Sequence, residues 1–127
     1  MNLLLDTHTL IWFFEGSDEL GKNAIQNIEN EKNTCFVSIV SIWEIAIKLS
    51  IKKMEMKIDF DKLNSLIWEN SFELLPIKFE HSKELINLPF HHKDPFDRMI
   101  ISQAIVEKMP IISKDDNFKN YEIKQIW

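Results

Sequence analysis

Cysteine, glycine and proline are all scarce in this sequence. Cys35 is the only cysteine among 127 residues, which rules out a disulfide within the chain and makes a reducing cytoplasm the expected location. The chain has only 2 glycines and 4 prolines, so collagen-like and low-complexity sequences and a many-turned all-β fold are excluded. It also lacks the roughly 18-residue apolar run of a membrane span and the basic N-terminal region of an export signal.

The sequence also lacks the excess of basic residues with which many proteins bind nucleic acid. The net charge is −5, and Arg98 is the only arginine. Binding of a polyanion through bulk positive charge is therefore unexpected, although a divalent cation held by acidic residues would reverse the local sign. The residues that are present, 45% hydrophobic and 28% charged, suit a soluble globular protein with one domain over residues 1–127.

Short apolar runs alternate with segments of helical periodicity. We expect strands at residues 3–5, 34–37, 72–77, 110–113 and 124–127. We expect helices at residues 9–14, 39–51, 59–69, 81–88 and 95–108. Ser17 or Asp18 is expected to cap one more helix, Ser38 and Asp94 are the expected caps of two others, and Gly16 ends the first. This order predicts an α/β sandwich with a mainly parallel sheet.

Four acidic residues lie just after expected strands or in the first turns of expected helices. Asp6 ends the first strand, Asp115 lies two residues past Ser113, and Glu44 and Asp97 are expected in the first turns of helices. Because the carboxyl ends of parallel strands meet at one edge, we expect the four carboxylates to converge there. Like charges ~4 Å apart repel by roughly 4 kcal/mol, so such a cluster takes up protons or binds cations. Oxygen ligands without clustered cysteine favour Mg²⁺ or Mn²⁺, which suits phosphodiester hydrolysis.

These acids also have purely structural interpretations. Glu44 can complete a capping box with Ser41 or pair with Lys48 one turn later. Asp97 can complement a helix dipole, and residues 115–117 can form a polar turn. The four acids fit a single edge of the sheet together, which favours the functional interpretation.

Several other side chains have open interpretations. His8 is expected to be packed or solvated, although it lies near Asp6, and Cys35 is expected to be buried and inert. The four tryptophans are expected in the core or at an interface. Four basic residues either contact phosphates or are solvated surface charges: Lys48, Lys93, Arg98 and Lys114.

Four motifs follow one another along the chain: LLLDTHTL at residues 3–10, VSIVSIWEI at 37–45, DPFDRMIISQA at 94–104 and IISKDDNF at 111–118. In this order they resemble a PIN domain, and in particular the VapC-type toxins of toxin–antitoxin pairs. The resemblance implies a three-layer α/β/α fold and a metal-dependent endoribonuclease that uses Mg²⁺ or Mn²⁺. The implied catalytic and metal-binding residues are Asp6, Glu44, Asp97 and Asp115.

The spacing within the motifs indicates which of two nearby aspartates matches each acid of the family. Asp97 fits the third acid of the family, because Ile100 follows three residues later and Ala104 seven residues later, whereas Asp94 does not fit. Ser113 stands where the family more often has threonine, and Asp116 adds a second charge beside the fourth acid.

The resemblance also implies partners. These are an RNA substrate, a small cognate antitoxin and, in many such toxins, a second copy of the chain, with no membrane association. The alternatives are a PIN-like housekeeping nuclease and a non-catalytic RNA- or protein-binding module. A phosphatase of the haloacid dehalogenase type would need a second aspartate at the position of His8, which speaks against it.

Overall fold

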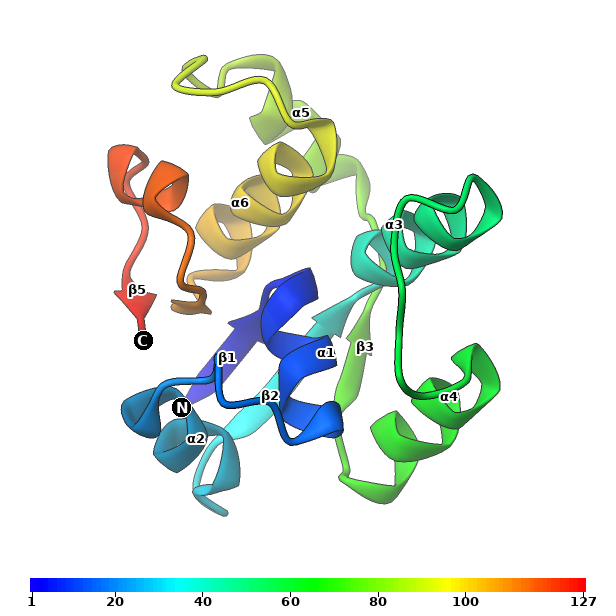
Figure 1. Ribbon diagram of the computed structural model, residues 1–127. Helices are drawn as coiled ribbons and strands as arrows, with labels where there is room; N and C mark the ends of the chain where they lie inside the picture. The colour runs from blue at the N-terminus through cyan, green and yellow to red at the C-terminus, as the bar shows by residue number, and fades with distance from the viewer.

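The computed structural model describes residues 1–127 (Figure 1). The five strands are β1 (Asn2–Leu5), β2 (Thr34–Ser38), β3 (Glu73–Leu75), β4 (Ile111–Ile112) and β5 (Gln125–Ile126). The six α-helices are α1 (Thr7–Glu15), α2 (Lys22–Glu29), α3 (Ile39–Ser50), α4 (Phe60–Glu69), α5 (Phe79–Ile86) and α6 (Pro95–Glu107). A short 3₁₀ helix, η1 (Asp116–Asn120), lies between β4 and β5.

The strands form one five-stranded sheet in the order β3-β2-β1-β4-β5, and every pairing is parallel. The predicted α/β fold with a mainly parallel sheet is therefore confirmed. In the register, Leu5 of β1 lies beside Val37 of β2 and Ile112 of β4. The carboxyl ends of these three strands consequently share one edge of the sheet, and Figure 1 shows α1, α3 and α6 around that end.

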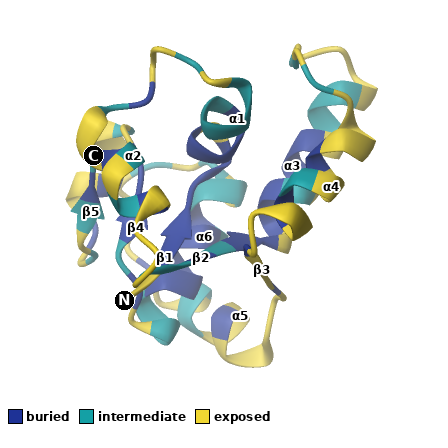
Figure 2. Cartoon of the chain, turned by 90° about the horizontal axis from the view of Figure 1, so that it is seen from below, coloured by how far each residue is buried: buried dark blue, intermediate teal, exposed yellow.

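The sheet has an apolar core on each face. Helices cover both cores, so the fold has three layers: helices, sheet and helices. Alternate strand residues point to opposite faces. One core joins Leu3 and Leu5 to α1, α2 and α4 through Leu10, Ala24 and Leu63. The other joins Leu4 and Ile111 to α6 and η1 through Ile100, Ala104 and Phe118. Figure 2 shows the central strands β1 and β4 and the inner turns of the helices as largely buried, while most exposed residues lie in loops and on outer helix faces.

Local signals place most helix ends where the sequence predicts them. Ser38 caps α3 by accepting a hydrogen bond from the Val40 backbone N–H, and Asp94 caps α6 by accepting one from the Asp97 N–H. Pro95 occupies the first turn of α6, where its missing N–H leaves no donor unpaired. Gly16 ends α1 in the left-handed conformation, with φ of 62°, that glycine adopts most easily.

Some local predictions are wrong. Helix α2 begins after Gly21, because the Ser17 hydroxyl instead accepts a hydrogen bond from the Glu19 N–H within a turn. Strand β3 is shorter than predicted and stops before Pro76, which cannot donate to a neighbouring strand. Trp43 and Trp68 are 59% and 70% exposed, so of the two expected places for the tryptophans, core or interface, the core does not apply to these two. No helix has the length and apolar character needed to cross a membrane.

Candidate functional site

Asp6 is buried at the carboxyl end of β1, where it begins α1. Its Oδ1 accepts a hydrogen bond from the Thr9 backbone N–H at 2.8 Å, which makes it the N-cap of the helix. Burial raises the pKa of this carboxyl, and hydrogen bonds from Ser113 and Thr9 oppose the rise only in part. The carboxylate is thus held in one orientation in a place where its charge is costly.

Glu44 is buried in the second turn of α3, not in the first turn that the sequence analysis expected. The Thr7 hydroxyl donates to its Oε1 at 2.7 Å and lies 2.9 Å from the Ser41 hydroxyl. Lys48 pairs with Oε2 one helical turn away at 2.5 Å. The capping box with Ser41 is therefore not formed, whereas the pair with Lys48 is. Because Thr7 directly follows Asp6, this hydrogen bond ties Glu44 to the start of α1 beside Asp6.

Asp97 experiences the charges of all the other candidate acids. Its side chain is 22% exposed, and its pKa is raised from 3.8 to about 8. Burial is the largest cause, followed by the negative charges of Asp94, Asp115, Glu44 and Asp6. The structure thus brings the four predicted site residues together, and their mutual repulsion is strongest at Asp97. Asp94 contributes charge while its own Oδ1 is used as the cap of α6.

The structure also distinguishes the two adjacent aspartates after β4. Asp115 is partly buried, caps η1 through the Asn117 N–H at 2.9 Å and lines a cavity with Asp6. Asp116 has an 88% exposed side chain and pairs with Lys119 at 2.8 Å. Only Asp115 therefore faces the other acids.

The donor set fits a hydrated divalent cation. No group of three His, Cys, Asp or Glu side chains is arranged to hold an ion directly. Carboxylates that repel one another are relieved by a cation, and Mg²⁺ usually keeps several of its waters while one or two carboxylates bind it. The crowding that raises the pKa of Asp97 is the observation that supports this fit.

His92 is a contact of Asp97 that the sequence analysis missed. Its Nε2 lies 3.1 Å from Asp97 Oδ2, and its Nδ1 lies 2.8 Å from the Tyr121 hydroxyl. The same hydroxyl accepts a hydrogen bond from Arg98 at 3.2 Å. These contacts join the loop before α6 to the segment after η1, and no spacing along the chain indicates them.

The basic residues for which the sequence left two interpretations, phosphate contact or solvated surface charge, differ in their surroundings. Arg98 is neither a phosphate contact nor a surface charge, because it is buried and donates to the carbonyl oxygens of Leu88 and Pro89. Lys48 is paired with Glu44, and Lys114 is exposed and paired with Glu19 at 2.9 Å. Lys114 is therefore the basic residue that lines the cavity beside the acids.

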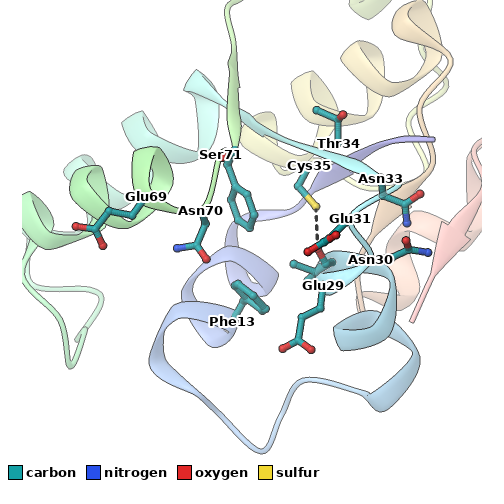
Figure 3. A pocket seen from close by; sticks show the side chains of 12 residues that line it. Phe13, Glu29, Asn30, Glu31, Asn33, Thr34, Cys35, Glu69, Asn70 and Ser71 are labelled. Carbon is teal, nitrogen blue, oxygen red and sulfur yellow. Dashed lines mark hydrogen bonds between the residues drawn. The ribbon is translucent and has the colours of Figure 1, made fainter.

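A larger cavity, of about 560 Å³, lies away from these acids (Figure 3). It is formed by the ends of α2 and α4 and the start of β2, at the opposite edge of the sheet. Its lining includes Phe13, Phe72 and Cys35, whose thiol contacts the Ile28 carbonyl oxygen at 3.8 Å. Burial raises the pKa of this thiol to about 11, so it is inert as expected. We place the candidate site at the four acids, because only there do reactive groups converge.

A family model supports the same assignment of the fold. The model described as PIN domain matches residues 3–124. No curated protein matches the sequence.

Solved structures with the same fold are available for comparison. A chain of VapBC2 from Rickettsia felis, bound to a DNA fragment from their promoter, is 16% identical with a TM-score of 0.75, and the match covers 98% of this chain and 97% of that chain. A chain of a toxin–antitoxin complex from Klebsiella pneumoniae is 18% identical with a TM-score of 0.62, covering 91% and 89%. The PIN domain endonuclease Utp24 is 17% identical with a TM-score of 0.53, covering 93% and 74%. At these identities the likeness concerns the fold.

Proposed function

The chain belongs to the PIN domain family, a family of nucleases, and from this premise we propose that it is a metal-dependent endoribonuclease, the toxin of a toxin–antitoxin pair. Residues 1–127 would act as one domain in the cytoplasm. The observation that carries the proposal is the convergence of the acids at Asp97, where burial and then the charges of neighbouring carboxylates raise the pKa to about 8. Such crowding at the carboxyl edge of a parallel sheet is typical of a catalytic site.

Each acid has a role that follows from its surroundings. Asp6, Glu44 and Asp97 would hold Mg²⁺ or Mn²⁺, and Asp115 would complete the ring and position the attacking water or a second ion. A bound ion of this kind makes a water more acidic and neutralises charge on the phosphate. The Thr7 hydroxyl holds Glu44 Oε1, and the Thr9 N–H holds Asp6 Oδ1, so these carboxylates keep their orientation without an ion.

The raised pKa of Asp97 also supports a role for a cation. With a pKa of about 8, the carboxyl of Asp97 favours its protonated form at neutral pH in the metal-free protein. Binding of a cation favours the charged form and releases this proton.

A partner protein is proposed on two grounds. Solved chains with this fold come from toxin–antitoxin complexes. In addition, an apolar groove of about 280 Å³ lies between α3, α4 and β3 and would suit an apolar segment of an antitoxin or a second copy of the chain. It is lined mainly by Ile39, Ile42, Phe60, Leu63, Ile67 and Leu74.

The decisive test is cleavage of a panel of structured RNAs, including transfer RNA, by protein purified free of any partner. We expect cleavage with Mg²⁺ or Mn²⁺, none with EDTA, and a loss of turnover by orders of magnitude in Asp97→Asn. Asp116→Asn is the matched control, because this exposed aspartate lies beside the site without facing it. Thermal melting of each variant shows whether it is folded.

The alternatives make different predictions in the same test. Metal-independent cleavage, or cleavage that persists in Asp97→Asn, would mean a contaminating nuclease. Binding of RNA without cleavage of any member of the panel would favour the non-catalytic module. Cleavage without any effect on growth when the protein is expressed alone would favour a housekeeping nuclease over a toxin.

A further inference from the structure

A small open cavity of about 230 Å³ adjoins the acids on the side of α1. Asp6 and Asp115 form one wall, and His8, Trp12 and Lys114 form the remainder. We propose that this cavity is a subsite for one unpaired nucleotide next to the cleaved phosphodiester, with its base stacked on Trp12. The inference rests on the proposed ribonuclease function and names a residue, Trp12, that would contact the RNA beside the acids.

Trp12 is held in place as a rigid stacking surface. It lies one helical turn after His8 on α1, with ring centroids 5.5 Å apart. Trp127 meets it in an edge-on arrangement at 6.0 Å and 67°. Trp12 is half-buried and lines the open cavity, so part of its indole is accessible. Aromatic side chains of this kind accept any base, because every base has a π-face.

Other residues of α1 carry the packing of the helix. Leu10 and Ile11 are buried in the core, and Phe13 and Phe14 pack against Phe72 at 5.9 and 5.4 Å. Trp12 packs against the edge of the same core and also lines the open cavity, so α1 has other core contacts besides those of Trp12. The part of the indole that faces the cavity is available to a stacked base.

Lys114 shows that an anion fits at the mouth of this cavity. Its Nζ lies 5.9 Å from the centroid of Trp12 and binds Glu19 Oε2 at 2.9 Å. Both side chains of this pair are more than half exposed, at 53% and 57%, so the pair is weak and exchangeable. A phosphate of the RNA would replace the Glu19 carboxylate on Lys114.

The negative net charge of the protein is compatible with such a subsite. At −5, the molecule cannot attract RNA through bulk positive charge. Short-range stacking next to the acids supplies affinity that does not depend on net charge. A base can stack on Trp12 only when it is unpaired and turned outward, which excludes a continuous duplex and favours a loop or bulge.

The test is binding of a fluorescein-labelled single-stranded RNA, and of the same RNA in a duplex, in Ca²⁺ buffer by fluorescence anisotropy. We expect the single strand to bind more tightly than the duplex. Trp12→Leu should weaken single-strand binding about tenfold, and Trp12→Phe should retain most of it, because a phenyl ring still stacks on a base. Trp68→Leu is the control, because Trp68 is 70% exposed on α4, away from the cavity.

Lys114 is tested through the salt dependence of binding. Loss of one phosphate contact should reduce the slope of log K against log salt by about 0.7 in Lys114→Gln. An unchanged slope would contradict the phosphate contact.

The outcomes separate the subsite from the proposed function. Equal affinity for duplex and single strand, or an unchanged affinity in Trp12→Leu, overturns the subsite even if the protein cleaves RNA. Binding that depends on Trp12 without any metal-dependent cleavage supports the subsite and overturns the ribonuclease function. If Trp12→Phe loses as much binding and melts as early as Trp12→Leu, Trp12 is a packing residue and the proposal is wrong.

Discussion

At Asp97, burial and the neighbouring carboxylates act in the same direction, and both disfavour the charged form. Such a group destabilises the folded protein once it loses its proton. Proteins keep destabilising groups where function requires them. The destabilisation by the charged form of Asp97 can therefore be measured as a dependence of the free energy of unfolding on pH.

The metal-free protein should lose stability as pH rises from about 4 to about 8. Asp97 has a pKa of about 8 when folded and an ordinary value of 3.8, so across this range the folded state binds a proton that the unfolded state has released. The raised pKa of Asp6 acts in the same direction. Urea unfolding at several pH values in EDTA measures the effect.

Asp97→Asn isolates this contribution, since the amide does not titrate. Its stability should fall less steeply with pH, and the variant should be the more stable protein above pH 8. Parallel curves for the two proteins would show that Asp97 titrates normally.

His92 should orient Asp97 for metal binding. With Nε2 on Asp97 Oδ2 and Nδ1 on Tyr121, the imidazole fixes one oxygen and leaves the other free. Removal of a partner of a ligand typically weakens metal binding about 10–100-fold. We therefore expect His92→Phe to bind Mn²⁺ at least about tenfold more weakly by isothermal titration.

His91→Phe is the matched control for this experiment. His91 packs edge-on against Tyr121 at 4.8 Å and makes no hydrogen bond to the acids. Equal loss of affinity in both variants would mean that the loop is disturbed as a whole.

At the scale of the element, the N-terminus of α6 combines a cap with a site residue. Asp94 accepts the Asp97 N–H at 2.9 Å, while its charge raises the pKa of Asp97. The cap stabilises the helix, and the charge destabilises the site. Two substitutions at this position separate the effects.

Asp94→Ala should lower the free energy of unfolding by about 1 kcal/mol, because it removes the cap. Asp94→Asn should cost little or even stabilise the protein, since asparagine caps as well and carries no charge. Chemical denaturation of both variants at pH 7 measures the difference. Equal destabilisation by both would mean that the charge of Asp94, rather than its cap, supports the fold.

At the scale of the molecule, a bound cation should stabilise the whole fold, because the site is assembled from residues after β1 and β4 and from helices α3 and α6. A ligand at 100 times its Kd adds about 2.7 kcal/mol to the free energy of unfolding. Mn²⁺ should therefore raise the melting temperature, and EDTA should reverse the rise. The effect should be retained in Asp116→Asn and reduced in Asp97→Asn; an equal rise in both variants would place the ion elsewhere.

Local sequence determined most of the secondary structure. Runs such as Leu3 to Leu5 form buried strands because they are too short for helices and lack alternation. Ser38, Asp94 and Gly16 set helix ends through contacts within a few residues. The closeness of the four acids followed from the same local facts, because parallel strands bring their carboxyl ends to one edge. Their catalytic roles stay a prediction.

Only the tertiary structure decided contacts between segments far apart in the chain. The link from Thr7 to Glu44 spans 37 residues, and His92 meets Tyr121 across 29 residues. Arg98 looks like a surface charge in the sequence, yet folding buries it against backbone carbonyl oxygens. Trp12 packs against the core, and only the tertiary structure shows that it also lines an open cavity. Residue type determines which contacts a side chain can make, but packing of distant elements determines which of them it does make.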